Sequence, residues 1–210
     1  MHAVDHVFVF CRSGAPEVEA LQRAGLPVGL RREHQGQGTA NLCIGFAGCY
    51  LELLWLADET AARDPHVKPL GLHERSRWRD NTASPFGVAV RPTTPGGAPP
   101  FVPWDYTPRY LPPQFRIEMA CNSGVLGEPM LFQVDRPWQP FGPPHALRER
   151  AVAEVRLTVP NLAPRSLLRE VQVPGLVIAD GPHHRLELTF AGNRTRQLDL
   201  APALPVALHF

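Results

Sequence analysis

Two polar side chains attract attention because apolar residues surround them. His6 lies in an alternating segment, residues 4–11, on the same face as Phe8 and Phe10, and Glu52 lies within Leu-Glu-Leu-Leu-Trp at 51–55. A lone buried carboxylate is unfavourable unless it is paired, protonated or bound to a metal. A His and a Glu offer one neutral nitrogen and one anionic oxygen, which suits zinc, iron, manganese or nickel. A His–Glu hydrogen bond inside a cleft would satisfy both groups as well, and the residues alone leave the two interpretations open.

A third group of polar residues lies in one short segment, His-Gln-Gly-Gln-Gly-Thr-Ala-Asn at 34–41. Its glycines allow positive φ and a close approach of the backbone to a ligand. His34, Gln37 and Asn41 add donors and acceptors within the same turn. The alternative is a β-hairpin whose polar side chains cap their own backbone. We expect a structural turn from which His34 or Asn41 reaches a cleft.

Aromatic residues accompany prolines between Pro92 and Pro144, where much of the chain's proline is concentrated. Trp104, Tyr106 and Tyr110 in this stiff stretch suit the wall of a substrate site, with hydroxyl groups as polar handles. They would equally suit the cover of an exposed sheet edge or a subunit interface.

The elements that must position these residues follow from the apolar pattern. Residues 4–11 predict a strand and 15–25 a helix, with Gly25 as its stop, and three strands follow in the first 58 residues. The same order is predicted again near the C-terminus, and a Phe-Ala-Gly tripeptide occurs at corresponding places, 46–48 and 190–192. The further predicted strands are 27–33, 39–47, 49–57, 151–159, 175–179, 185–191 and 195–200, with a second short helix at 163–171.

The predicted fold class is therefore α+β, with two βαβββ modules at 1–58 and 149–210. Between them, residues 59–148 read as an insert with a Pro-rich, aromatic loop. It contains a charged, helical stretch at 70–78 and strand-like segments at 85–91, 115–121 and 129–135.

Composition excludes several classes of function. The formal net charge of +1, with 20% charged residues of both signs, offers no basic stripe for nucleic acid or for a membrane surface. No apolar run reaches the roughly 20 residues that span a bilayer. The first strand begins so near Met1 that we expect no signal peptide and a cytoplasmic location. The four cysteines form no C-x-x-C pair and are predicted to be buried core residues.

Three of these segments together resemble a known family. Asp5-His6, the 34–41 turn and Tyr-Leu-Glu-Leu at 50–53 are similar, in this order, to the glyoxalase-like branch of the vicinal oxygen chelate superfamily, which also holds bleomycin-resistance proteins and dioxygenases. The resemblance implies that two modules curve around a cleft and that residues from their first and last strands hold a divalent metal, expected to be Mn, Ni, Zn or Fe. His6 and Glu52 would be two of the ligands.

The resemblance also implies ligands from the second module, where Glu154 and Asp199 lie near the corresponding positions. A site of one His and three carboxylates would favour a hard metal such as manganese. Glu154 shares its strand face with Arg156, however, so an ordinary ion pair explains it equally well.

The function implied is that of a glyoxalase-like enzyme, a lyase, isomerase or dioxygenase, acting on a small oxygenated molecule. The metal would chelate two neighbouring oxygens as a Lewis acid. His34 would transfer or orient a proton, because imidazole titrates near neutral pH. Gln37, Asn41, Trp104, Tyr106 and Tyr110 would contact the substrate. The alternative is a metal-free protein that binds or sequesters a small molecule in the same cleft, and either protein could be a homodimer.

Overall fold

The computed structural model describes residues 1–193 and 195–210 and contains two β-sheets. The first five elements are β1 (His2–Phe10), α1 (Val18–Arg23), β2 (Leu30–His34), β3 (Thr39–Gly45) and β4 (Tyr50–Leu56). Strands β2, β3 and β4 are antiparallel neighbours, and β4 runs parallel to β1. The strands and the helix predicted for residues 4–57 are present: β1 begins earlier than predicted, and the other four elements are shorter.

Residues 59–148 extend this same sheet. Their elements are α2 (Glu59–Ala62), η1 (Lys68–Leu70), α3 (Leu72–Ser76), β5 (Phe86–Pro92), β6 (Pro103–Tyr106), β7 (Ile117–Ala120), η2 (Cys121–Gly124) and β8 (Met130–Gln133). Strand β5 pairs antiparallel with β1, and β8 pairs parallel with β5, as β4 does with β1. The strand order β2-β3-β4-β1-β5-β8-β7-β6 thus contains two similar halves that meet at β1 and β5.

The C-terminal segment forms a separate sheet. Its elements are β9 (Val152–Val159), η3 (Leu167–Arg169), β10 (Leu176–Asp180), β11 (Arg185–Phe190), β12 (Gln197–Asp199) and β13 (Val206–His209), and the strand order is β10-β9-β11-β13-β12. Strand β9 lies between β10 and β11, whereas β1 lies between β4 and β5.

This pairing differs from the predicted one, in which 149–210 completes the cleft of the first module. The half that faces the first module comes from the expected insert, because β5, not β9, forms hydrogen bonds with β1. The boundaries at residues 58 and 148 stay predictions. The helix expected at 163–171 is a single 3-10 turn, and β6 and β13 were not foreseen.

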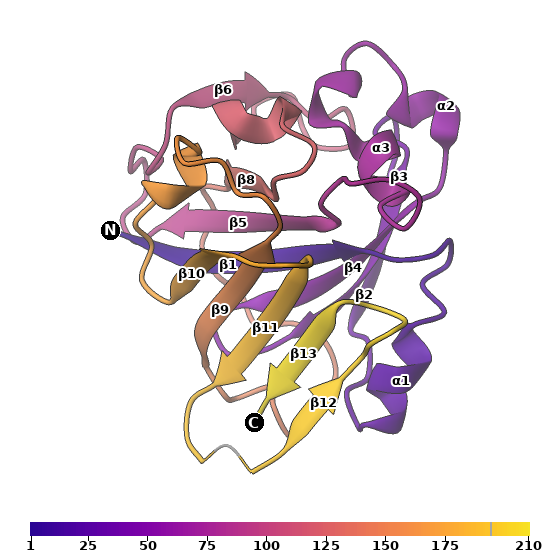
Figure 1. The fold of residues 1–210 in the computed structure, drawn as a ribbon, viewed down its shortest axis with the longest axis vertical. Helices are drawn as coiled ribbons and strands as arrows, with labels where there is room; N and C mark the ends of the chain where they lie inside the picture. The colour runs from indigo at the N-terminus through magenta and orange to yellow at the C-terminus, as the bar shows by residue number, and fades with distance from the viewer. Residues whose placement is uncertain (194) are drawn as a thin grey trace.

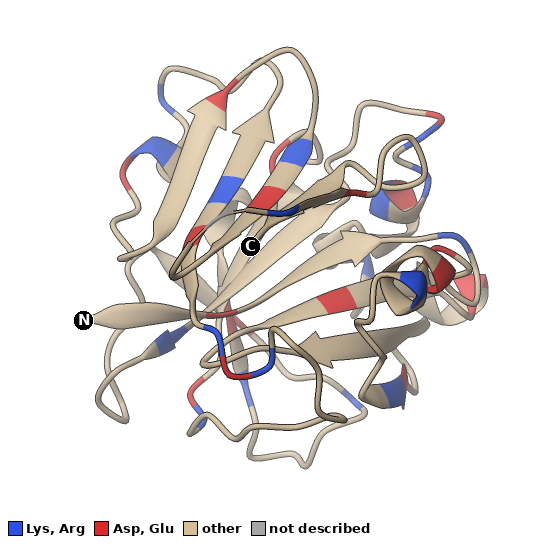
Figure 2. Ribbon diagram, turned by 90° about the horizontal axis from the view of Figure 1, so that it is seen from below, with Lys and Arg blue, Asp and Glu red and all other residues tan. Residues whose placement is uncertain are grey.

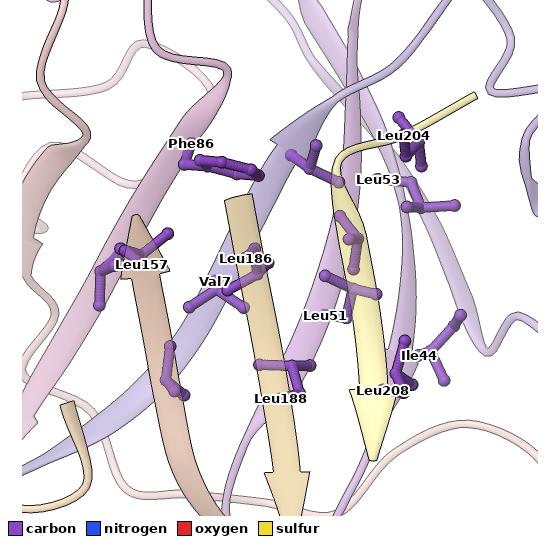
Figure 3. Packing of buried hydrophobic residues seen from close by; sticks show 14 of the residues in the cluster. Val7, Ile44, Leu51, Leu53, Phe86, Leu157, Leu186, Leu188, Leu204 and Leu208 are labelled. Atoms are coloured by element: carbon purple, nitrogen blue, oxygen red, sulfur yellow. The ribbon is translucent and has the colours of Figure 1, made fainter. Parts of the chain in front are cut away.

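The main core lies between the two sheets. In Figure 3, Val7, Leu51 and Leu53 of the first sheet meet Leu186 and Leu208 of the second. The second sheet, orange to yellow in Figure 1, lies against β1 and β4. Because side chains alternate along a strand, the residues between these core positions point to the opposite face of the first sheet, where His6, Phe8 and Glu52 lie.

Charges of both signs are interspersed over the molecule (Figure 2), as the composition predicts. Within the described residues, no helix is long and apolar enough to cross a membrane.

Candidate active site

A cavity of about 220 Å³ lies on the face of the first sheet turned away from the C-terminal sheet. This volume lies below the roughly 300–1,000 Å³ of sites for drug-sized ligands, so only a small molecule would fit. Its polar lining consists of His6, Arg32, His34, Gln37, Asn41, Tyr50, Glu52, Tyr106, Tyr110, Arg116, Asp135 and Arg136. Its apolar lining consists of Phe8, Leu54, Leu70, Leu72, Leu111, Phe115, Ile117, Met119, Met130, Phe132 and Val134.

Asp5 fixes the orientation of His6. The two side chains form a hydrogen bond of 2.8 Å between His6 Nδ1 and Asp5 Oδ1, and Asp5 also accepts from Arg136 at 2.9 Å and Arg91 at 3.3 Å. Burial opposes ionisation of Asp5, but the His6 hydrogen bond and the charges of His6 and Arg136 outweigh it, and the pKa of Asp5 falls to about 2. An ionised carboxylate only accepts, so His6 Nδ1 is the donor. His6 Nε2 is thereby left facing Glu52.

His6 Nε2 lies 3.5 Å from Glu52 Oε2, with both side chains buried. An imidazole whose Nδ1 carries a proton offers only a lone pair at Nε2 unless it takes up a second proton. A carboxylate oxygen is also an acceptor. The two atoms therefore face each other favourably only when a proton, or a cation, lies between them. The stacked ring of Tyr50, 4.3 Å from that of His6, holds the imidazole in place.

Asn41 connects Glu52 to His34. Its amide nitrogen donates to Glu52 Oε1 and lies 3.4 Å from His34 Nε2, while its oxygen accepts from the backbone of Arg32 at 3.2 Å. Because the amide nitrogen only donates, His34 Nε2 is the acceptor and His34 Nδ1 donates to Thr39 Oγ1 at 2.8 Å. Burial lowers the pKa of His34, so this imidazole is neutral at neutral pH.

The 34–41 turn is both structural and part of the cleft. Gln37 donates to Thr39 Oγ1 at 2.9 Å and accepts from the Tyr106 hydroxyl at 3.1 Å. Tyr110 stacks on His34 with ring centroids 4.5 Å apart. Burial raises the pKa of Tyr106 to about 12, so the hydroxyl keeps its proton and donates. Both interpretations of this turn therefore apply.

Gly38 is the glycine of this turn that tolerates least change. Its φ is +81°, and a Cβ there would meet the carbonyl oxygen of Asp58, which precedes α2, and would lie 2.6 Å from the backbone nitrogen of Ala62, the last residue of α2. We expect Gly38→Ala to lower the free energy of unfolding by about 2–4 kcal/mol, because strain and overpacking add. Urea unfolding measures it. Gly36→Ala is the matched control: its φ is +76°, but its Cβ would meet only the Arg109 side chain. Equal losses in the two variants would contradict the overpacking argument.

Three residues expected in the site lie elsewhere. Trp104 does not line the cavity, and its indole donates to Ser123 Oγ at 3.0 Å. Glu154 and Asp199 belong to the second sheet, where Glu154 pairs with Arg156 at 3.0 Å and Asp199 with Arg185 at 2.7 Å. The ion pair between neighbours on one strand face is thus the correct interpretation of Glu154.

The similar halves of the first sheet show which residues replace the missing ligands. Phe8 is opposite Glu52 on β4 and Gly87 on β5, and Ala89 is opposite His6 on β1 and Phe132 on β8. When the two halves are superposed, β1 on β5 and β4 on β8, the counterpart of His6 is therefore Gly87, and the counterpart of Glu52 is Phe132. Neither counterpart can bind a metal.

The donors present do not fit a metal centre with three or four protein ligands. No group of three His, Cys, Asp or Glu suited to a metal occurs in the described part of the chain. His6 and Glu52 would supply two ligands, with Asp5 orienting the histidine. Binding of Mn, Ni, Zn or Fe stays a prediction.

Sequence reasoning missed several residues of the cavity, among them Arg32, Tyr50 and Arg136. Arg32 and Tyr50 stand two positions before His34 and Glu52, so strand periodicity alone places them on the same face. Arg136 follows β8 and reaches both Asp5 and the Tyr50 hydroxyl, at 2.9 and 3.2 Å. Nothing in the local sequence signals that role.

The chain was compared with known proteins. Residues 4–97 match the model of a family described as a glyoxalase-like domain. No curated protein matches. Among solved structures, a hypothetical protein from Staphylococcus aureus is similar with a TM-score of 0.53 and 9% identity, over 99% of this chain and 98% of that one. At this identity the likeness concerns the fold alone. Residues 4–97 therefore carry a glyoxalase-like domain, consistent with the vicinal oxygen chelate superfamily that the Asp5-His6, 34–41 and 50–53 segments predict.

Proposed function

We propose that this chain is a glyoxalase-like enzyme that moves a proton on a small, largely apolar molecule bearing neighbouring oxygens. The observation that carries the proposal is the His6–Glu52 pair, two buried groups that share one cavity and require a proton or cation between them. Buried titratable groups that converge on a cleft are typical of acid–base sites. The proposed reaction class is isomerisation or lyase chemistry that begins next to a carbonyl.

Glu52 is the proposed base. Asn41 holds one of its oxygens, so the other is directed toward His6 and the cavity. With the shared proton on His6, where Asp5 stabilises the imidazolium, Glu52 is a carboxylate that can take a proton from a carbon next to a carbonyl and return it to the neighbouring position. In this proposal His34 acts through Asn41, which it orients, rather than by touching the substrate.

Tyr50 is the proposed donor to the developing oxyanion. It lines the cavity beside His6, and Arg136 donates to its oxygen at 3.2 Å. Burial raises the pKa of Tyr50 well above its ordinary value, so the hydroxyl keeps its proton. A fixed neutral donor at the place where negative charge develops is an effective means of stabilising an enolate.

Exchange of carbon-bound hydrogen in D2O tests this proposal without knowledge of the natural substrate. The probes are 3-hydroxybutan-2-one and 1-phenylpropane-1,2-dione. Exchange is measured by proton NMR as the loss of the signals of the hydrogens on the carbons next to each carbonyl. We expect the protein to accelerate exchange and Glu52→Gln to reduce the acceleration by roughly 100-fold or more, because the amide cannot take up a proton.

Glu33→Gln is the control, since this carboxylate lies in the same sheet, on β2, but does not line the cavity and is 65% exposed. Acceleration that survives Glu52→Gln would overturn the role of Glu52. Absence of any acceleration by the unmodified protein on either probe would overturn the proposal of proton transfer.

A metal-free binding protein is the second candidate, and the apolar lining together with Gly87 and Phe132 at the ligand positions favours it. If this candidate is correct, the same probes should raise the melting temperature of the protein in a separate thermal-unfolding measurement, and the protein should not accelerate their hydrogen exchange. A homodimer and a cytoplasmic location stay predictions for either function.

A further inference from the structure

Arg32 lines the cavity and forms no ion pair with any residue that the structure describes. It lies on β2 two residues before His34, on the same face, with an exposed guanidinium at the rim. No carboxylate of the described residues lies within the 4.0 Å that defines an ion pair with Arg32, and none of the hydrogen bonds found involves its guanidinium. Only its backbone is engaged, by Asn41.

The other two arginines of the cavity already take part in ion pairs. Arg116 pairs with Asp105 at 2.7 Å, and Arg136 pairs with Asp5 at 2.9 Å. Arg32 is therefore the lining arginine that, within the described residues, has a charge available for a ligand. The adjacent Arg31 points to the opposite face, where it lies over the Trp55 ring at 5.6 Å and 3.8 Å from Glu33.

Charge also fixes the direction in which an anionic ligand would enter. The Glu52 carboxylate lies inside the cavity and would repel a second anion. The negatively charged group of a ligand is therefore favoured at the rim of the cavity, and its uncharged oxygens are favoured at the inner end. Two residues of a strand separate Arg32 from His34 by roughly 7 Å, a span that a small molecule can bridge.

We propose that Arg32 is a specificity-determining residue that binds a carboxylate of the substrate, whose neutral oxygens meet His6 and Glu52. This inference rests on the proposed function, and it narrows the substrate class to small 2-oxo or hydroxy acids with an apolar part. The planar guanidinium matches a carboxylate with two parallel hydrogen bonds, which an ammonium group cannot do.

Calorimetric titration of the intact protein tests the inference with 2-oxo-4-phenylbutanoate and its methyl ester. These probes share their apolar part and ketone but differ in charge. We expect the acid to bind roughly tenfold or more tightly than the ester, as for a charge-assisted hydrogen-bonded pair. Arg32→Gln should remove this preference by weakening the acid alone, whereas Arg31→Gln, one residue away on the other face, should keep it.

Equal binding of acid and ester to the unmodified protein would overturn the inference, and so would a preference that survives Arg32→Gln. Failure of both probes to bind would overturn it as well. None of these results would affect the proposed proton transfer, because the exchange experiment uses uncharged probes. Loss of exchange with normal acid preference would instead leave Arg32 as the anion-binding residue of a binding protein.

Discussion

Replacement of Arg75 by methionine is expected to lower the free energy of unfolding by about 3–5 kcal/mol, because it leaves several buried carbonyl groups without a hydrogen-bond donor. Arg75 has no exposed surface, and its guanidinium donates to the backbone oxygens of Glu128 at 2.6 Å, Ser123 at 3.1 Å and Leu126 at 3.2 Å. Longer contacts reach the carbonyls of Ser84 and Val125. One side chain thus holds residues 123–128 against the entry to β5.

Burial lowers the pKa of Arg75 to about 10, so the group is still charged at neutral pH. Its charge is balanced by carbonyl dipoles, because no ion pair with Arg75 occurs among the described residues. Urea unfolding followed by circular dichroism measures the loss. Arg77→Met is the control, since Arg77 directly follows α3, the helix that contains Arg75, but is 59% exposed. A loss below about 1 kcal/mol in Arg75→Met, within the range of surface changes, would contradict this account.

Replacement of Asp5 by asparagine should have the second large effect, about 3–5 kcal/mol, because it leaves Arg91 and Arg136 without their buried anion. The effect should depend on pH. The folded-state pKa is about 2 and the ordinary value is 3.8, so the ionised carboxylate contributes stability above about pH 4 and loses it as pH falls toward 2. The difference of nearly two units corresponds to about 2.5 kcal/mol.

Urea unfolding at several pH values between 5 and 2 measures this contribution. The gap in stability between the unmodified protein and Asp5→Asn should narrow by about 2 kcal/mol over that range, because Asp5 is still half ionised at pH 2 in the folded state. Asp80→Asn, whose carboxylate is 70% exposed, should leave the pH dependence unchanged. Parallel pH curves for the unmodified protein and Asp5→Asn would show that Asp5 titrates in the same way folded and unfolded.

The sequence predicted those residues of the site whose positions depend on local strand and turn geometry. His6, Glu52, His34, Gln37 and Asn41 all line the cavity, because the two-residue period of a strand assigns a face to each and the turn brings them together. Tyr106 and Tyr110 also reach it. An aromatic type alone did not separate them from Trp104, which the register of β6 and β7 directs to Ser123.

The pairing of strands could not be predicted in the same way. Strands β5 and β9 have similar apolar alternation, and only the contacts made over long chain distances decide that β5 joins β1. Hence Gly87 and Phe132 were not recognised at the ligand positions, and Glu154 was assigned to them instead. Arg32 was missed for a different reason, because an arginine on an edge strand is ordinarily a solvated charge.

The central place of β1 and β5 affects how ligands reach this protein. The two halves of the cavity are joined by the hydrogen bonds of this pair, whose register shifts once, between Val4 and His6, and the C-terminal sheet packs behind β1. A hinge motion of one half against the other would therefore break both these hydrogen bonds and the core. Entry and release would instead depend on the segments that line the cavity outside the strands, residues 110–116 and 134–136. Binding rates are then set by local loop fluctuations, which are faster than movements of whole domains.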